Sequence, residues 1–293
     1  MSTRAGTYAA PAKLNLMLRV TGRRADGYHL LQTVFRFLDY GDTLTLRVRE
    51  DGAIARGYEL PGVAPEADLT VRAAKLLQSA TGSRLGCELG LDKRLPMGAG
   101  LGGGSSDAAT VLLALNDLWG TGLTRGGLQA LGLQLGADVP AFLYGRSAWA
   151  EGVGESLTAL ALPPAWYVVL TPPVSVPTRE IFADPELTRD SIPLKIRGFS
   201  AGGAENTLNS LTPVVCRRYP MVADWLERLG QYVTPSTAAK FGPARMTGSG
   251  SAIFAAFDEE TEARRVLAAL TPELQGFVAR GLDRHPHYAL AGD

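Results

Sequence analysis

Residues 96–109 read PMGAGLGGGSSDAA, with five glycines followed at once by two serines and an aspartate. Behind them Ala108, Val111, Leu112 and Leu115 recur at helical spacing, which predicts a helix over residues 105–118. A glycine loop that opens a helix brings unpaired backbone N–H groups and a partial positive charge close to an anion. The stretch therefore predicts a phosphate-binding loop; a flexible loop ending in an ordinary N-cap is the alternative.

Other phosphate-binding motifs do not match this stretch. The pattern GxxxxGK[ST] is absent, because no Gly-Lys pair occurs in the chain. Gly98, Gly100 and Gly103 match GxGxxG, but Pro96 separates them from the preceding strand, and Asp117 lies on the predicted helix rather than at a strand end. The VAIK, HRD and DFG runs of protein kinases are also missing. Neither a dinucleotide-binding nor a protein-kinase site is predicted.

The composition is that of a soluble globular protein. Of 293 residues, 46% are apolar and 20% charged, and 29 basic side chains balance 29 acidic ones. No nucleic-acid partner is expected from this balance. Cys87 and Cys216 form no CxxC pair, and no apolar run approaches the ~18 residues of a membrane span. Lys13 and Asn15 interrupt the apolar N-terminal segment, so we expect no signal peptide. The two isolated cysteines and the lack of a long apolar run lead us to expect a cytoplasmic protein without a membrane partner.

The remaining pattern mixes strands and helices without a regular alternation, which predicts an α+β fold. Apolar residues alternate over 14–20 and 42–48, and a proline-flanked strand near residues 163–177 marks a domain boundary at about residue 160. Residues 136–145 are expected to form a loop and a strand, and residues 283–293 a mobile tail. In the second half, helices are predicted over residues 206–216, 220–229 and 259–270, and a strand over residues 251–257.

Several side chains outside the glycine loop are candidate site residues, each with a simpler reading. Asp138 suits a general base, but aspartate after Gly-Ala is as often a turn or helix-stop residue. Lys13 on a strand is ordinarily a solvated lysine, and Phe182 ordinarily packs in a core. Tyr28 and His29 follow a DG turn, where they could bind a ligand or pack. Residues 246–251, MTGSGS, form a second glycine loop or a plain hairpin turn.

The loop at residues 96–109 resembles the phosphate loop of the GHMP kinases, the superfamily of galactokinase, homoserine, mevalonate and phosphomevalonate kinases. Its GLGGGSS form, preceded by KRLPMG, is closest to the branch that acts on a cytidyl diphosphate. Six further stretches agree in order between about residues 10 and 257, and their conjunction is more specific than any one of them. They are APAKLNLML, RADGYHLLQTVF, LGADVPAFLYG, AEGVGE, PTREIF and MTGSGSAIFAAF.

This resemblance implies a two-domain fold and a small-molecule kinase. Residues 1–160 would form a ribosomal-S5-like ATP-binding and catalytic domain, and residues 161–293 a ferredoxin-like substrate-binding domain. The enzyme would use ATP with Mg²⁺ to phosphorylate the C2 hydroxyl of 4-diphosphocytidyl-2-C-methyl-D-erythritol in the non-mevalonate isoprenoid pathway, as a monomer or homodimer. The alternatives are another GHMP kinase acting on a homoserine- or mevalonate-like alcohol, and a non-catalytic nucleotide-binding relative.

The resemblance also implies roles for individual residues. Asp138 would be the general base and Lys13 the cation beside it, where positive charge stabilises a carboxylate and developing negative charge. Tyr28 and Phe182 would sandwich a cytosine whose edge His29 hydrogen-bonds. The other substrate contacts would be Asn15, Pro177, Thr178, Gly248, Ser249 and Gly250, and the ATP contacts Asp68, Lys93, Pro96, Gly98, Gly100, Gly102, Gly103, Gly104, Ser105 and Ser106.

Three positions depart from the family's usual pattern. Asp68 stands where asparagine is common, which puts an amide contact to adenine in doubt. Ala99 adds a methyl group to the loop, and we expect that side chain to turn outward. Asp107 lies early in the predicted helix, where it could help to hold Mg²⁺ or face solvent; we expect it to face solvent. No metal-ligand set is predicted, because no clear ligand pair stands out.

Overall fold

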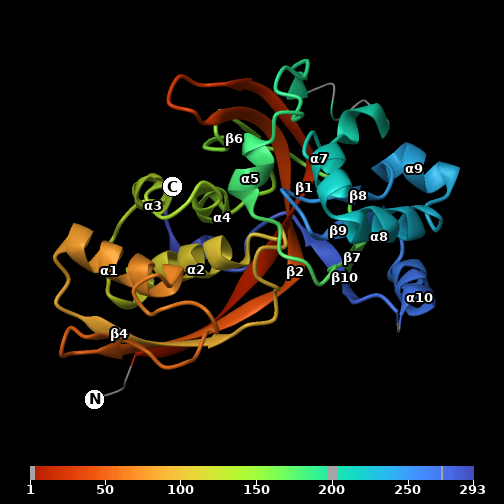
Figure 1. Cartoon of the computed structure of the whole chain (residues 1–293). Helices are drawn as coiled ribbons and strands as arrows, with labels where there is room; N and C mark the ends of the chain where they lie inside the picture. Colours follow the sequence, from red (N-terminus) through yellow and green to blue (C-terminus); the bar gives the residue numbers. More distant parts are fainter. Residues whose placement is uncertain (1–3, 197–198, 200–203, 272) are drawn as a thin grey trace.

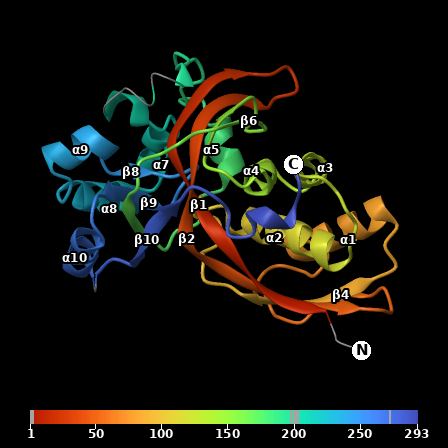
Figure 2. The same cartoon turned by 180° about the vertical axis from the view of Figure 1, so that it is seen from behind.

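Two long strands organise the molecule. The computed structural model describes residues 4–196, 199, 204–271 and 273–293. Strands β1 (Ala5–Arg23) and β2 (His29–Arg49) form an antiparallel hairpin that runs the length of the protein (Figures 1 and 2). Both strands are far longer than the predicted segments 14–20 and 42–48, because both faces are buried along their middle and the alternation that marks a half-buried strand is lost there.

The strands of the described chain join one mixed sheet around β2. That strand pairs antiparallel with β1, β4, β5 and β10, and β10 continues the sheet to β7 in the second half of the chain. Among the paired strands of the described residues, only β3 and β4 run parallel. The other strands are β3 (Ile54–Arg56), β4 (Gly86–Asp92), β5 (Ala148–Glu151), β6 (Ser156–Ala159), β7 (Trp166–Leu170), β8 (Arg245–Met246), β9 (Ile253–Phe257) and β10 (Gly276–Leu282).

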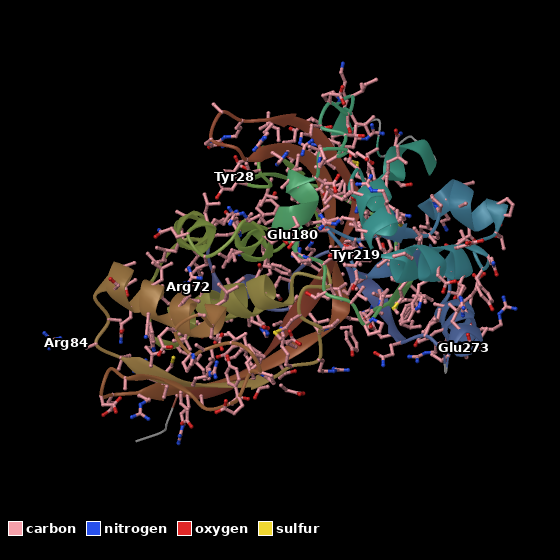
Figure 3. All side chains as sticks on the ribbon, in the orientation of Figure 1. Tyr28, Arg72, Arg84, Glu180, Tyr219 and Glu273 are labelled. Atoms are coloured by element: carbon pink, nitrogen blue, oxygen red, sulfur yellow. The ribbon has the colours of Figure 1, made fainter. Side chains whose placement is uncertain are left out.

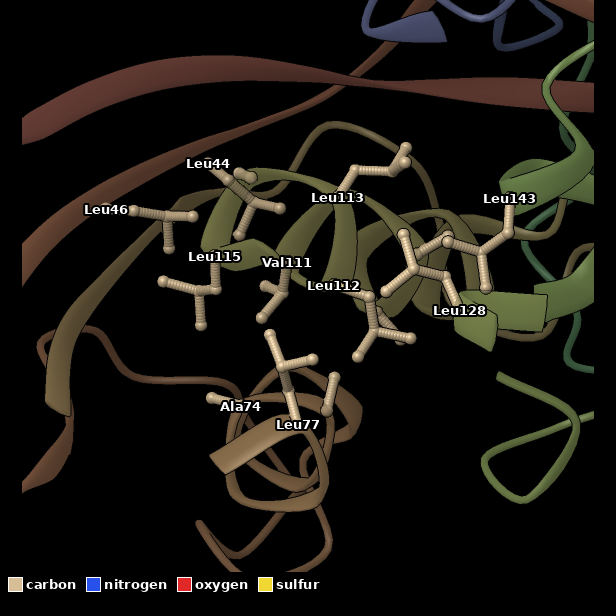
Figure 4. Close-up of a cluster of buried hydrophobic side chains, with 14 of the residues drawn as sticks. Leu44, Leu46, Ala74, Leu77, Val111, Leu112, Leu113, Leu115, Leu128 and Leu143 are labelled. Carbon is tan, nitrogen blue, oxygen red and sulfur yellow. The ribbon is translucent and has the colours of Figure 1, made fainter. Parts of the chain in front are cut away.

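In the first half, helices α1 (Leu69–Thr81) and α2 (Gly103–Leu118) cover the sheet of β4 and β2 (Figure 1). Side chains from all these elements meet in one core (Figure 4). Leu112 of α2, Leu77 of α1 and Leu44 of β2 are fully buried there. Because α2 is buried on nearly every side, its N-terminal loop is held at a fixed place. Helices α3 (Arg125–Leu133) and α4 (Val139–Tyr144) complete this half.

In the second half, helices pack beside β7, β9 and β10, at the end of the molecule away from α1 (Figures 1 and 2). The helix predicted over residues 206–216 is wrong in part. Asn209 accepts a hydrogen bond from the amide of Leu211, and this turn separates a 3-10 segment from the next helix. The segments here are α5 (Thr178–Ala183), η1 (Ala204–Thr207), α7 (Thr212–Arg218), α8 (Pro220–Gly230), α9 (Pro235–Phe241) and α10 (Glu260–Leu270).

Two further expectations are wrong. Residues 139–144 form helix α4 instead of a strand, with Pro140 in the first turn, where its missing N–H is not needed. The segment 283–293 is packed against the fold: Arg125 donates to the carbonyl oxygens of Tyr288 and Ala291, and a short 3-10 helix, η2 (Tyr288–Leu290), forms there. The mixed α+β architecture is as predicted, whereas the boundary at residue 160 stays a prediction.

Candidate active site

A cavity of about 570 Å³ lies between the two halves of the chain. Its wall includes both glycine loops, the middle of β1, the start of α2 and one side of α5. Most predicted site residues therefore meet in one place although they are far apart in sequence. The predicted residues that line the cavity are Lys13, Asn15, Asp68, Lys93, Pro96, Gly98, Gly100, Gly102, Gly103, Gly104, Ser105, Asp138, Thr178, Phe182, Gly248 and Ser249.

The start of α2 presents free backbone donors to this cavity. Gly102 is the N-cap residue, and no side chain of the described chain caps the helix. The amides of Gly103, Gly104 and Ser105 find no hydrogen-bond acceptor in the described residues, whereas the amide of Ser106 donates to the carbonyl oxygen of Gly102 at 2.8 Å. Three adjacent N–H groups and the helix dipole make an anion site. Ser106 differs from its neighbours: its side chain is buried away from the cavity, and its Oγ has no partner in the described chain.

Glycine is required where the two loops and β1 come together. Gly100 and Gly102 have φ of 78° and 74°, a region that other residues rarely adopt. A Cβ on Gly102 would lie 3.0 Å from Cγ of Lys13, and one on Gly100 would lie 2.4 Å from the carbonyl oxygen of Thr247.

Ala99 is buried in the core, not turned outward as expected, and its carbonyl oxygen accepts a hydrogen bond from the amide of Ala252.

Lys13 and Asp138 form an ion pair in the cavity wall. Nζ of Lys13 is 3.4 Å from Oδ2 of Asp138, and Lys13 is only 3% exposed while the Asp138 side chain is 38% exposed. Nζ also donates to Oδ1 of Asn15 at 2.5 Å and to the carbonyl oxygen of Gly100 at 3.0 Å. Asp138 precedes α4, but its carboxylate caps no amide of that helix in the described chain. The pair thus offers a fixed cation beside an accessible carboxylate.

Asn15 is held rigidly beside Lys13. Its Nδ2 donates to Oγ1 of Thr33 at 2.8 Å, and its backbone amide donates to Oγ1 of Thr247 at 2.9 Å. A Cβ on Gly248 would lie 3.3 Å from Oδ1 of Asn15, so the second glycine loop closely approaches this amide. Thr33 and Thr247 were not predicted from the sequence, and isolated threonines on strands carry no local signal of such a role.

A second lysine lies on the other side of the first glycine loop. Nζ of Lys93 contacts Oδ2 of Asp42 at 2.5 Å and Oδ2 of Asp107 at 2.8 Å. Asp107 is buried, which is the opposite of the solvent-facing position expected for it, and its Oδ1 has no partner in the described chain. Burial, opposed by Lys93 and reinforced by Asp42, raises the pKa of Asp107 to about 7. Burial by itself would lower the pKa of Lys93, but the two carboxylates outweigh it and raise that pKa.

Asp68 lines the cavity, but its carboxylate is occupied by the protein. It is the N-cap of α1, and Oδ1 accepts hydrogen bonds from the amide and the hydroxyl of Thr70. Oδ2 accepts from the hydroxyl of Tyr58 at 2.7 Å and pairs with Arg56 at 3.3 Å. These contacts give Asp68 a structural function at the rim of the cavity, and any role toward a nucleotide stays a prediction.

The second glycine loop is held in place by hydrogen bonds from two other segments of the chain. Nδ2 of Asn209 donates to the carbonyl oxygens of Met246 and Gly248. The hydroxyls of Ser249 and Thr178 lie 2.6 Å apart, which joins the loop to the first turn of α5. Gly250 does not line the cavity. The arrangement places Gly248 and Ser249 opposite the first glycine loop, and Asn209 is a supporting residue to which the sequence assigned no role.

The predicted base-binding residues are only partly assembled. Tyr28 is 64% exposed at the end of the β1–β2 hairpin, near the helix that carries Glu180 (Figure 3). Its ring contacts no other ring of the described chain. The ring of His29, not that of Tyr28, faces Phe182, with centroids 5.0 Å apart and planes tilted by 34°. Tyr28, His29 and Pro177 do not line the cavity, whereas Phe182 does.

Comparison with known proteins places this arrangement in a family. The model "GHMP kinases N terminal domain" matches residues 68–146, and "GHMP kinases C terminal" matches residues 199–274. A protein of Thiobacillus denitrificans named 4-diphosphocytidyl-2-C-methyl-D-erythritol kinase is 60% identical over 281 residues, which cover 96% of this chain and 97% of that protein. The chain belongs to the GHMP kinase family. It is therefore an ATP-dependent phosphotransferase with the two-domain fold of that family.

Solved structures agree with this membership. A crystal structure of 4-(cytidine 5'-diphospho)-2C-methyl-D-erythritol kinase superposes with a TM-score of 0.78 at 38% identity, covering 94% of this chain and 99% of that one. Homoserine kinase from Cytophaga hutchinsonii superposes with a TM-score of 0.65 at 18% identity, covering 97% of this chain and 96% of that chain. The second likeness shows the fold alone. No helix in the described part of this GHMP kinase is long and apolar enough to cross a bilayer.

Proposed function

We propose that this GHMP kinase transfers the γ-phosphoryl group of ATP to the C2 hydroxyl of 4-diphosphocytidyl-2-C-methyl-D-erythritol, a step of the non-mevalonate isoprenoid pathway. The names of its relatives support this substrate. The observation that carries the chemistry is the Lys13–Asp138 pair, which shares one cavity with the free amides at the start of α2. An acceptor hydroxyl next to Asp138 and phosphates on those amides would face each other across the cavity.

The acceptor end would activate and orient the hydroxyl. Oδ2 of Asp138 accepts the hydroxyl proton or its hydrogen bond, and Lys13, 3.4 Å from that oxygen, offsets the charge that develops on the attacking oxygen. Lys13 is itself positioned by Asn15 and by the carbonyl oxygen of Gly100. Phosphoryl transfer depends mainly on such positioning and charge neutralisation, so a rigid pair with one accessible carboxylate suits it.

The phosphate end would hold the triphosphate on Gly103, Gly104 and Ser105. Among the described residues no group of three His, Cys, Asp or Glu side chains could hold a metal ion. Mg²⁺ bound to ATP needs only one or two protein oxygens, and the Ser105 hydroxyl at the cavity wall fits that demand. Bound there, Mg²⁺ would neutralise phosphate charge; the chain's own part is to fix the phosphates on the amides.

The cytidyl group would lie at the α5 end of the cavity, next to Phe182 and His29. An aromatic face offers stacking to a flat base, and homoserine or mevalonate has no base to use it. Tyr28, exposed on the hairpin, would supply the second face of the predicted sandwich by moving toward Phe182. This end of the site distinguishes the proposed substrate from other alcohols of the family.

The test is ADP release from Mg-ATP with 4-diphosphocytidyl-2-C-methyl-D-erythritol, run beside homoserine and mevalonate, for the wild type and for Asp138→Asn. We expect turnover with the cytidyl substrate only, and its loss in the variant. Turnover with another alcohol would overturn the substrate but keep the kinase chemistry. Binding of ATP without turnover of any of the three would make a non-catalytic nucleotide-binding role the better account.

A further inference from the structure

Arg189 lies outside the motifs that carry the family resemblance, yet it joins the two walls of the proposed base site. Its Nε donates to Nε2 of His29 at 3.1 Å. Its Nη2 donates to the carbonyl oxygens of Phe182 at 2.9 Å and Asp184 at 2.7 Å, and Nη1 donates to that of Leu187 at 3.1 Å. Four donors of one planar guanidinium are therefore committed, three to the segment that carries Phe182 and one to the hairpin that carries His29.

The contact with Arg189 decides which nitrogen of His29 carries the proton. Guanidinium is only a donor, so Nε2 of His29 must be an acceptor and the neutral ring carries its proton on Nδ1. No described residue hydrogen-bonds to Nδ1 of His29. Partial burial, reinforced by the positive charges of Arg189 and Arg23 beside the ring, lowers the pKa of His29 and favours the neutral ring. His29 thus offers one free N–H donor of fixed identity.

We propose that Arg189 is a positioning residue that holds His29 as an Nδ1–H donor and thereby selects cytosine over uracil at the base site. N3 of cytosine is an acceptor, whereas N3 of uracil carries a proton. A fixed N–H donor on His29 can therefore hydrogen-bond to N3 of cytosine. With uracil, the N–H of His29 and the N3–H of the base would face each other, and neither would have an acceptor. The proposal rests on the proposed function for its ligand, but the tautomer of His29 is a property of the free protein.

The first measurement is ¹⁵N NMR of the imidazole of His29 in the free, full-length protein, with the His29→Gln spectrum to assign its signals. We expect the wild type to carry the proton on Nδ1, and Arg189→Gln to show a mixture of tautomers and a raised pKa. A wild-type ring protonated on Nε2 would overturn the proposal. A merely structural role for Arg189 would not require one particular tautomer.

The second measurement is calorimetric binding of cytidine 5'-diphosphate and uridine 5'-diphosphate. Loss of one directed hydrogen bond should reduce the preference for the cytidine ligand about tenfold in Arg189→Gln. Arg189→Lys keeps a charge without the planar fork and should give an intermediate preference, which also serves if the glutamine variant folds poorly. In a His29→Gln background, Arg189→Gln should change the preference little, because the two residues act through one contact.

The matched control is Arg217→Gln. Arg217 also ties the Asp184 segment to its surroundings, but through the carboxylates of Asp184 and Glu186 and without touching His29. An equal loss of preference in this control would show general loosening of the segment and overturn the proposal. Unchanged preference in Arg189→Gln, with normal binding of cytidine 5'-diphosphate by the wild type, would overturn it while leaving the proposed function intact. Wild type that binds neither nucleotide would overturn the substrate and the base selection together.

Discussion

Two lysines flank the first glycine loop, and their surroundings differ in charge and exposure. Lys13 meets one carboxylate, Asp138, whose side chain is 38% exposed to the cavity. Lys93 meets two carboxylates, Asp42 and Asp107, whose side chains are 0% and 4% exposed. The first group leaves carboxylate oxygen accessible to an incoming hydroxyl. In the second group both carboxylates are buried, and burial, reinforced by the negative charge of Asp42, raises the pKa of Asp107.

A lysine–aspartate contact therefore does not by itself identify a catalytic group. What matters is whether an acid remains reachable once the fold has formed. In the Lys93 group, Oδ1 of Asp42 also accepts from the amides of Arg94 at 2.6 Å and Leu95 at 2.7 Å, so this group fastens the segment leading into the glycine loop. We therefore infer a catalytic role for the Lys13 group and a supporting role for the Lys93 group, and four substitutions test that division.

The largest effect is expected for Asp138→Asn. Loss of the carboxylate should lower kcat by about a hundred- to ten-thousand-fold, the usual range for a general base. Steady-state ADP release measures this change, and urea unfolding should show little change in stability because the side chain is partly exposed. Asp117→Asn, an exposed aspartate near the other end of α2, is the matched control. Retention of wild-type kcat in Asp138→Asn would remove the distinction between the two lysine groups.

Lys13→Met should have the next largest effect. Methionine fills the buried volume without the charge, so kcat should fall by about a hundredfold through loss of electrostatic stabilisation. Since Asn15 and Gly100 also lose a donor, a smaller fall in stability should accompany it. Single-turnover kinetics at saturating ATP separates the chemical step from binding. A variant with weaker ATP binding but normal single-turnover rate would move Lys13 from catalysis to support.

Asp42→Asn tests the supporting group. The buried carboxylate accepts two amides and the Lys93 ammonium, so its neutralisation should lower the free energy of unfolding by about 2 kcal/mol. Urea denaturation followed by circular dichroism measures this loss. Asp92→Asn, an exposed aspartate at the end of β4, should leave stability unchanged. A stable Asp42→Asn protein with strongly reduced kcat would instead assign chemistry to the Lys93 group.

Asp107→Asn should have the smallest effect of the four on kcat, because it removes one of two acids that share Lys93 and leaves the Lys13–Asp138 pair in place. The folded-state pKa of Asp107 is raised from 3.8 to about 7, so the folded chain binds this proton more tightly than the unfolded chain. The stability that this bound proton contributes is fully present below pH 3.8 and is lost as the pH rises through about 7. The slope of this loss is at most about 1.4 kcal/mol per pH unit.

The measurement is the difference in unfolding free energy between wild type and Asp107→Asn from pH 4 to 8. The wild type should lose stability relative to the variant as pH rises, since only the wild type releases this proton. Other carboxylates titrate in both proteins and cancel in the difference. A difference that does not change with pH would show that Asp107 is ionised throughout, and the two lysine groups would then differ less than proposed.

The sequence predicts local structure well where one periodicity dominates. Helix α2, the strand β7 and the helices α8 and α10 lie close to their predicted positions. Errors occur where long-range contacts override local pattern. The length of β2 depends on four partner strands, and residues 139–144 form a helix although they follow a loop-like GAD sequence. The tail at 283–293 packs against the fold because Arg125, which is distant in sequence, donates hydrogen bonds to two of its carbonyl oxygens.

By itself the sequence determined which residues can carry the chemistry: glycines dense enough for a phosphate loop, and motif residues such as Lys13 and Asp138 in a recognisable order. Only the tertiary structure decided what each of them meets. Asp107 and Asp138 are both aspartates next to glycine-rich stretches and both line the cavity, yet the Asp107 side chain is 4% exposed against Lys93 and Asp42, whereas the Asp138 side chain is 38% exposed. Burial and charge at a residue are set by neighbours from distant segments, and no local pattern contains them.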